Sequence, residues 1–437
     1  MPAAHFYSRK LLLVKLPIAA AAIALCAWLW VALLPLPPAS LTLSTGLPEG
    51  VYHAHAQRYT EAFARHGITL NVATSDGSEM NLRRLRGAAQ PHADLAFVQG
   101  GVAEAGARLP GGRLETIARV DVEPVWIFSR VPGIDSLEQL QGRKVSLGPP
   151  GSGTRKLALT LLEQVRMDAA DVVDTPVTGM NAAQALEQGS LDAIIMVSAG
   201  DSPVVKAMLR APGVSLVQLK KITAFTERLP FLQVRLLPQG ALDAAAQLPP
   251  RDSAVLITTS SLVARADLHP ALQRLAAEVA REMHGGPGPF HRAGDFPTLR
   301  RIEFPASEEA RRTLAQGRPW LEEELPFWWA QIAVRLLVIC LPIALLAYWL
   351  ARAIPAYLRW LLESRIARWY GELKFIEFDL ARESVTGLDR VKHLQRLASI
   401  EKRMTAFATP RYLMPRWFTL REHIAFVRAR LDRGRGR

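Results

Sequence analysis

Two long apolar runs lie near opposite ends of the chain, and a segment of mixed polarity lies between them. Residues 16–36 contain no charged side chain, and residues 328–350 contain only one, Arg335. Each run has the roughly 20 residues that a helix needs to cross a hydrocarbon core of ~30 Å. The pattern predicts two transmembrane helices that hold one large domain, residues 39–326, between them.

Within the central segment, short apolar runs typical of strands alternate with runs of helical periodicity. Strand-like runs cover residues 41–45, 68–75, 94–99, 144–148 and 192–198, and helical patterns begin near Tyr52, Glu79 and Thr154. This alternation is typical of an α/β fold with a mainly parallel sheet. In such sheets, ligands bind where the carboxyl ends of strands meet the N-termini of helices.

Small and hydroxylated residues gather at these predicted junctions. They are Thr45, Gly46 and Tyr52 after the first strand, Ser75, Gly77, Ser78 and Asn81 after the second, Gln99 after the third, and Gly151, Ser152, Gly153 and Thr154 after the fourth. Glycines let backbone N–H groups approach a ligand, and a helix N-terminus offers unpaired donors and a partial positive charge. Four converging loops would bind a small solute that carries a carboxylate. Each loop alone is equally consistent with ordinary helix capping and turn formation.

The charge of the chain is concentrated at its ends. The formal net charge is +13, of which Arg9, Lys10 and Lys15 supply three; residues 351–437, with 19 basic and 9 acidic side chains, supply the rest. Because Lys and Arg beside transmembrane helices remain in the cytoplasm, both termini are predicted to be cytoplasmic and the large domain to lie outside. Attraction to anionic lipid headgroups explains the basic ends, so we expect no nucleic-acid partner.

One motif resembles a phosphate-binding loop. The segment GPPGSGTRK, residues 148–156, has glycines at the required spacing. However, Thr154 occupies the position of the essential lysine, and Arg155 occupies the position of the Ser or Thr that binds magnesium. The motif therefore does not indicate nucleotide hydrolysis.

Other catalytic patterns are also missing from the sequence. The histidines of the central domain form no HExxH motif, and Ser152 lacks the GxSxG context of an activated nucleophile. The two cysteines, Cys26 and Cys340, lie in the apolar runs, which leaves the central domain without a thiolate ligand. We therefore expect a protein that is not an enzyme and that needs no metal or cofactor.

The first apolar run has a second interpretation, a signal peptide that is removed. The residues that follow it, Pro38, Ala39 and Ser40, form a poor cleavage site. Lipidation at Cys26 is disfavoured because the preceding residue, Leu25, is larger than such processing prefers. We expect a retained helix, with cleavage as the alternative.

Five segments in a fixed order resemble a known family. They are TGLPEGVYHAHAQRYTEAFARHG (45–67), SDGSEMNLRRL (75–85), ADLAFVQGGVAEA (93–105), KVSLGPPGSGTRKLA (144–158) and SLVARADLHPALQRL (261–275). Together they resemble the solute receptors of tripartite ATP-independent periplasmic (TRAP) transporters, TAXI subfamily. The second apolar run and the segment SRIARWYGEL (364–373) resemble a membrane-tethered branch of that family.

The resemblance implies an α/β periplasmic-binding-protein fold of the second type, in which two lobes joined by crossover strands close on a ligand. The first lobe would hold about 40–125 and 223–300, and the second about 132–222. Two transmembrane helices would flank this domain. The N-terminus, residues 1–15, and an α-helical tail, residues 351–437, would lie in the cytoplasm.

The resemblance also implies roles for individual residues. Tyr52 would pack on the ligand, and the family's serine-rich turn corresponds to Ser75, Ser78 and Asn81. Gln99 would close the third strand, Gly151 to Thr154 would bind an anionic group, and Asp201 would accept an ammonium group or cap the next helix. Two departures put the ligand's identity in doubt: Pro48 and Glu49 interrupt a glycine-rich turn, and His53 replaces a tyrosine.

The implied function is capture of a small anionic or zwitterionic solute, amino-acid-like or dicarboxylate, at the inner membrane for a TRAP-type permease subunit. Tethering at both ends suggests an alternative, a sensor or scaffold that passes ligand occupancy to a cytoplasmic or membrane partner. An apolar stripe in the tail, from Leu388 to Met404 at helical spacing, could bind such a partner or form the buried face of a bundle. A structural protein with a degenerate cleft is the third possibility.

Overall fold

The computed structural model describes residues 3–48, 50–103, 111–200, 202–288, 290–382, 387–407 and 409–433. Glu49 and Asp201, which the sequence analysis singled out, lie outside the described residues. The chain divides into two compact units. One unit is Leu36–Val334, and the other combines Met1–Pro35 with Arg335–Arg437.

The unit Leu36–Val334 is built on one mixed sheet, in which ten strands are described. Eight of them follow the order β2-β1-β3-β10-β4-β7-β5-β6, while β8 pairs with β4 and β9 pairs with β10. In chain order the strands are β1 (Ser40–Ser44), β2 (Thr69–Ala73), β3 (Leu95–Gln99), β4 (Leu114–Ser129), β5 (Lys144–Ser146), β6 (Val173–Asp174), β7 (Ala193–Val197), β8 (Ser215–Leu216), β9 (Gln233–Leu237) and β10 (Ser253–Arg265).

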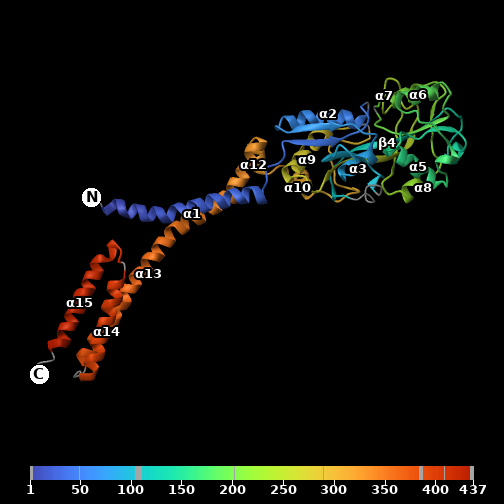
Figure 1. Cartoon of the computed structure of the whole chain (residues 1–437). Helices are drawn as coiled ribbons and strands as arrows, with labels where there is room; N and C mark the ends of the chain where they lie inside the picture. The colour runs from blue at the N-terminus through green and yellow to red at the C-terminus, as the bar shows by residue number, and fades with distance from the viewer. Residues whose placement is uncertain are drawn as a thin grey trace. The chain divides into compact units, whose positions relative to one another are not determined.

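Helices cover both ends of this sheet. They are α2 (Val51–Ala64), α3 (Ser78–Leu85), α5 (Gly153–Gln164), α6 (Gly179–Glu187), α7 (Pro203–Arg210), α8 (Ile222–Arg228), α9 (Pro270–His284), α10 (Glu308–Gln316), α11 (Trp320–Glu324) and α12 (Phe327–Arg335). Figure 1 shows α2, α3, α9 and α10 around one end and α5 to α8 around the other. We call β1 to β3 with the former helices the first lobe, and β5 to β7 with α5 to α8 the second lobe.

Two long antiparallel strands join the lobes. β1 pairs in parallel with β2 and β3, and β5 pairs in parallel with β6 and β7. Between these groups, β10 runs antiparallel to both β3 and β4, and β4 runs antiparallel to β7. The predicted α/β fold is confirmed, but the sheet is mixed because these two connecting strands run against their neighbours.

Each lobe has its own apolar core. In the first lobe, Phe63 of α2, Leu275 of α9 and Phe97 of β3 are buried in one apolar cluster. In the second lobe, Leu161 of α5 packs with Ile195 of β7. The burial of such large side chains supplies about 25 cal/mol for each Å² removed from water, so each lobe is stabilised largely by its own contacts.

The return of the chain to the first lobe differs from the expected position near residue 223. Phe225, Leu229 and Leu232 pack in the second core, together with Leu256 of β10. β9 pairs with the N-terminal half of β10, and β10 then continues into the first lobe. The crossing is therefore made by β10, because the apolar side chains of α8 are buried under the second lobe.

The other unit consists of helices. They are α1 (Ala3–Leu33), α13 (Leu341–Arg382), α14 (Gly387–Ala406) and α15 (Met414–Arg433), and a π-helical turn, Leu336–Cys340, precedes α13. Lys15–Leu33 and the helical run Phe327–Ala381 are long and apolar enough to cross a membrane. Within this unit, the Arg335 side chain donates hydrogen bonds to the carbonyl oxygens of Leu34 and Pro35.

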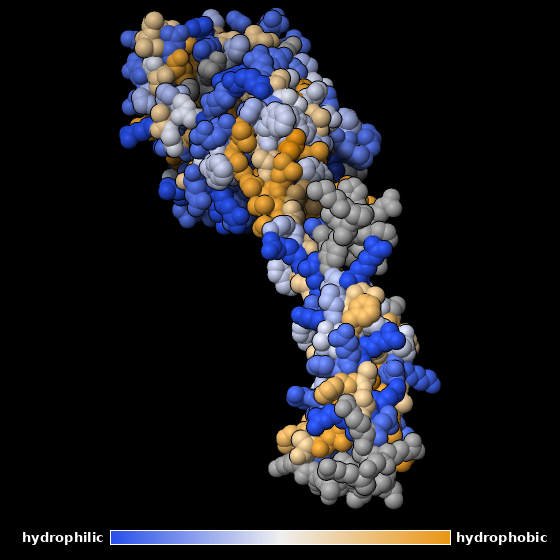
Figure 2. Space-filling model, turned by 90° about the vertical axis from the view of Figure 1, so that its left-hand side faces the viewer, coloured by the Kyte–Doolittle hydropathy of each residue, from blue (hydrophilic) through white to orange (hydrophobic). Residues whose placement is uncertain are grey.

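The C-terminal helices form a bundle with a core of its own. Trp369 of α13, Ile400 of α14 and Ile424 of α15 are buried together in it. The predicted stripe on α14 supplies part of this core, since Met404 is buried, although Val391 is 55% exposed. Hydrophilic side chains dominate the outer surface of these helices, with scattered apolar ones among them (Figure 2). Most of the stripe is therefore the buried face of a bundle.

Candidate ligand-binding cavity

A cavity of about 860 Å³ lies between the two lobes. The first lobe supplies the N-terminal turns of α2, the loop before α3, the end of β3 and the segment after α9. The second lobe supplies the turn before α5, the start of α6 and the segment between β7 and α7. Asp121, Val122 and Glu123 of the connecting strand β4 form part of the wall. The cavity is therefore lined from both lobes and from a strand that joins them.

The structure brings most of the predicted binding residues to this cavity. Gly46, Tyr52, Gly77, Ser78, Gln99, Ser152, Gly153 and Thr154 line it, whereas Thr45, Ser75, Asn81 and Gly151 do not. Asp201 lies outside the described residues, so its predicted role has no structural account. The loops that the glycine and hydroxylated residues marked in the sequence therefore include loops that line the cavity.

Three of the predicted residues that do not line the cavity support its wall. The Asn81 amide donates hydrogen bonds to the carbonyl oxygens of Thr45 and Phe97, over 2.5 and 2.7 Å. Its side-chain oxygen accepts hydrogen bonds from the hydroxyls of Ser44 and Ser75, over 2.6 and 2.7 Å. Because all four partners are used inside the protein, Asn81 fixes the ends of β1 and β3 rather than facing a solute.

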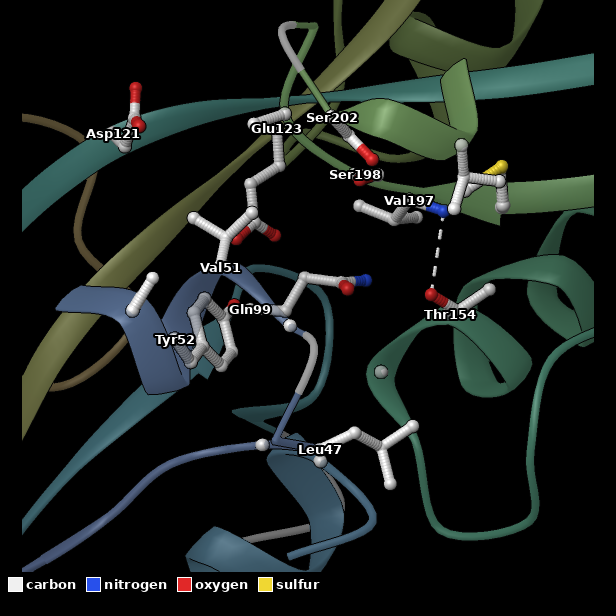
Figure 3. A pocket seen from close by; sticks show the side chains of 18 of the residues that line it. Leu47, Val51, Tyr52, Gln99, Asp121, Glu123, Thr154, Val197, Ser198 and Ser202 are labelled. Atoms are coloured by element: carbon white, nitrogen blue, oxygen red, sulfur yellow. Dashed lines mark hydrogen bonds between the residues drawn. The ribbon is translucent and has the colours of Figure 1, made fainter. Parts of the chain in front are cut away.

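The start of α5 is capped by the residue that precedes it. The Ser152 hydroxyl oxygen accepts a hydrogen bond from the Arg155 backbone N–H over 3.1 Å, and the hydroxyl donates to the Pro149 carbonyl oxygen over 2.7 Å. Thr154 Oγ1 accepts from the Val197 N–H over 3.4 Å, which joins α5 to the end of β7 (Figure 3). The Arg155 guanidinium pairs with Asp174 over 2.6 Å, so it does not act as part of a phosphate-binding loop.

The two lobes touch at a corner where only glycine fits. A Cβ atom on Gly153 would lie 2.8 Å from Gln99 Oε1, and one on Gly77 would lie 3.0 Å from the Ser152 Cα atom. Gly77 also has a φ of +133°, a backbone conformation that other residues rarely adopt. These glycines let the wall of one lobe lie directly against the wall of the other.

Two polar side chains are directed into the cavity without saturated hydrogen bonds. Gln99 is 5% exposed, and its Nε2 has no partner among the described residues. Tyr52 stacks on Phe97 at a ring distance of 5.4 Å, and its hydroxyl makes no well-aligned hydrogen bond to the described part of the chain. Since buried polar groups in proteins are nearly always paired, these two donors are suited to a bound solute.

Glu123 is a cavity residue that the sequence analysis missed. It is 9% exposed, and its carboxyl group lies near the hydroxyls of Tyr52 and Ser260. Burial raises the pKa of Glu123 to about 8; the hydroxyl of Tyr52 opposes this rise and the charge of Asp121 adds to it. The alternation Asp121-Val122-Glu123 within the long apolar strand β4 was the signal that could have drawn attention to it.

Histidines occupy another part of the wall. The rings of His55 and His284 lie 4.8 Å apart, and His291 Nε2 lies 3.4 Å from Asp121 Oδ1. Burial lowers the pKa of His284 to about 3, and the neighbouring His55 and other cationic groups contribute to the shift. His284 is therefore neutral at physiological pH, and it contributes shape rather than charge to the cavity wall.

Residues 44–256 match the NMT1-like family. Among solved structures, a protein of Bordetella bronchiseptica RB50 is 18% identical and has a TM-score of 0.39, over 56% of this chain and 70% of that one. The periplasmic aliphatic sulphonate binding protein SsuA of Escherichia coli is 17% identical, with a TM-score of 0.34, over 72% and 83% of the two chains. An ancestral arginine-binding protein bound to arginine is 13% identical, with a TM-score of 0.35, over 57% and 93%.

The family match covers both lobes and most of the cavity residues. The TM-scores of the solved structures are below 0.5, so nothing about the ligand or partners of those proteins is transferred to this chain. The resemblance to TAXI receptors, drawn from the five sequence segments, stays a prediction.

Proposed function

We propose that this protein is a membrane-anchored receptor that binds a small solute in the cavity between its lobes. The observation that carries this proposal is a cavity lined from both lobes, into which the Gln99 amide presents a donor without a partner among the described residues. Binding of a solute that contacts both walls favours the closed arrangement, because only that arrangement makes all the contacts. No covalent step is needed.

The remaining features support an anchored receptor. The two apolar helices would hold the protein in the inner membrane, and the basic residues beside them would keep both termini in the cytoplasm. The cavity domain would then lie in the periplasm. The solute class expected from the binding loops is a small molecule that carries a carboxylate, and a TRAP-type permease subunit would receive it.

A second candidate function is a tethered sensor, and a partly buried cluster of charges favours it. Arg274 of α9 pairs with Glu322 and Glu309, each over 2.6 Å, and Gln331 of α12 donates to Glu322 over 3.0 Å. The same helix α9 ends at His284 in the cavity wall. One rigid element thus connects the cavity to the segment that leads into the second apolar run.

The first experiment is thermal unfolding of the full-length protein in lipid nanodiscs with a panel of solutes. The panel contains amino acids, dicarboxylates, other organic acids and inorganic anions. A solute present at 100 times its dissociation constant adds about 2.7 kcal/mol to the free energy of unfolding, and the midpoint rises with its concentration. The double variant Tyr52→Phe, Gln99→Ala should lose this rise. A flat panel with folded protein would refute solute binding.

A second experiment separates transport from sensing. Uptake of the identified solute is measured in the native host with and without the gene. Loss of uptake supports the receptor of a transporter. Unchanged uptake, together with a solute-dependent change in the proteins that co-purify with the full-length chain, supports the sensor.

A further inference from the structure

We propose that the solute carries a cationic nitrogen, such as an ammonium or guanidinium group, and that Glu123 binds it. This inference rests on the proposed function, since it concerns the solute of the same cavity. It selects a zwitterion or cation over the dicarboxylate that the sequence analysis also allowed.

The balance of charge around the cavity is the first argument. Among the described lining residues, Asp76, Asp121 and Glu123 are acidic, while Arg58 is the only Lys or Arg; Asp76 and Arg58 are both exposed. A dicarboxylate in this cavity would place two negative charges near the carboxyl groups of Asp121 and Glu123. Inside a protein the repulsion between like charges a few ångströms apart is several times stronger than in water. The wall therefore favours a solute with at least one positive group.

The position of Glu123 is the second argument. Figure 3 shows its side chain pointing toward Tyr52 and Gln99. No Lys or Arg contributes to the pKa of the buried Glu123 carboxyl group. Because a buried carboxylate is costly to ionise unless it is paired, a cation supplied by the solute would stabilise the ionised form of Glu123.

The groups beside Glu123 could bind an anionic part of the same solute. Gln99 Nε2 is a donor that suits a carboxylate or carbonyl oxygen of the solute, while the Tyr52 hydroxyl lies beside Glu123 and would donate to its ionised carboxylate. The backbone at the start of α5, beside Gly153, adds the positive end of a helix. A solute with a carboxylate and a cationic nitrogen, as in a basic amino acid, would satisfy both sides.

A rival arrangement has the opposite dependence on pH. If Glu123 stayed protonated, its carboxyl group could donate a hydrogen bond to an anionic solute. Burial raises the pKa of Glu123 to about 8. A cation would expel the proton on binding, so its affinity would rise as the pH rises toward 8. An anion held by the protonated form would bind more weakly over the same range.

Several other titratable groups face Glu123 or the space beside it. They are Asp121 of the same strand, Tyr52, His55 and Arg58 of α2, Asp76 of the loop before α3, and His284 and His291 at and after the end of α9. A variant at Glu123 itself is therefore needed to assign the pH dependence to this residue.

The test is isothermal titration calorimetry of the full-length protein in nanodiscs of zwitterionic lipid. L-Arginine, L-lysine, L-glutamate and succinate serve as probes at about pH 6 and about pH 8, a range over which their charges change little. We expect a basic probe to bind, with affinity up to roughly fiftyfold higher at the upper pH. Glu123→Gln should weaken this binding at least tenfold near pH 8 and abolish its dependence on pH.

The matched control is Glu115→Gln, on the same strand but away from the cavity, which should bind like the unmodified protein. Thermal unfolding checks that both variants are folded. The inference is overturned if only anionic probes bind, if affinity falls as the pH rises, or if Glu123→Gln binds the basic probe as tightly as before. In those three cases the proposed receptor function still stands, whereas a folded protein that binds no probe or panel solute overturns both.

Discussion

The two walls of the cavity are held in place in different ways. In the first lobe, Asn81 joins segments that are 16 to 37 residues apart in the chain, through Phe97, Thr45 and Ser44. In the second lobe, the Ser152 side chain at the start of α5 bonds to Pro149 and Arg155, three residues away on either side. Longer-range contacts in this wall are a 3.4 Å hydrogen bond from the Val197 N–H to Thr154 and the partly exposed ion pair of Arg155 with Asp174. The first wall is thus fixed by a buried amide with four short hydrogen bonds, and the second by a local helix cap with fewer and more exposed long-range contacts.

The lobes also differ in their connection to the rest of the domain. In the first lobe, Arg274 of α9 pairs with Glu322, and Glu322 accepts a hydrogen bond from Gln331 of α12. A second ion pair joins two helices of this lobe: Arg65, at the end of α2, lies 2.6 Å from Glu282 of α9. We infer that the first lobe is the fixed side of the cavity and that the second lobe closes onto it. Changes in the first lobe should then act on stability, and changes at the wall of the second lobe should act on binding.

The largest effect is expected at Asn81. Asn81→Ala leaves two carbonyl groups and two hydroxyls without their buried partners, and each lost partner costs about 1 kcal/mol or more. The free energy of unfolding should fall by about 4 kcal/mol in urea denaturation. The control is Asn181→Ala, an exposed residue on the cavity wall of the second lobe, which should change it by less than about 0.5 kcal/mol. Equal effects of the two variants would contradict the distinction between the lobes.

The strand that joins the lobes should make stability depend on pH. Because burial raises the pKa of Glu123 to about 8, the folded protein retains a proton that the unfolded chain releases near pH 4.5. The contribution of Glu123 to the free energy of unfolding is therefore complete below about pH 4.5 and is lost as the pH rises to about 8. Relative to the unmodified protein, Glu123→Gln should be more stable by on the order of 3 kcal/mol above pH 8. Thermal or urea unfolding across this range measures the difference, and a constant difference at all pH values would count against it.

The connection between α9 and α12 should contribute a smaller amount. Arg274→Met leaves Glu322, which is 6% exposed, without its cationic partner and should lower the free energy of unfolding by about 2 kcal/mol. Arg312→Met removes a surface pair with Glu308 and should cost less than about 1 kcal/mol. If the two variants are equally stable, the buried cluster does not fasten the first lobe to α12.

The local elements of the domain could be predicted from the sequence. The helix expected from Tyr52 is α2, and the run at residues 94–99 is β3. The helix expected from Thr154 is α5, which ends at Gln164, two residues before Arg166 adopts a positive φ of 60°. These elements have short-range signals, namely apolar periodicity, glycine turns and caps.

The connecting strands and Glu123 could not be predicted in the same way. β4 and β10 are long and mostly buried on both faces, so they lack the alternation that marks a half-buried strand. The importance of Glu123 arises only when β4 passes between the lobes and brings it beside Tyr52 and Gln99. Such a placement depends on contacts between distant segments, which neither composition nor periodicity records.

A substitution of Gly153, at the corner where the lobes meet, should have the smallest effect on stability. It should nevertheless weaken the binding of the solute. Gly153→Ala places a Cβ atom 2.8 Å from Gln99 Oε1 in the opposite lobe, so either the Gln99 side chain or one lobe must shift. Alanine suits the first turn of α5 at least as well as glycine, so the unfolding midpoint without solute should stay the same or rise.

For the solute identified in the thermal panel, Gly153→Ala should weaken binding about tenfold, which corresponds to about 1.4 kcal/mol. Gly112→Ala is the control, because a Cβ atom there would meet no atom within 4 Å. Calorimetric titration of the two full-length variants gives the comparison. Unchanged affinity in Gly153→Ala would mean that the bound state does not bring Gln99 against the start of α5. The second lobe would then have to close along a different edge of the cavity, whose lining also includes Ser198 after β7 and His284 at the end of α9.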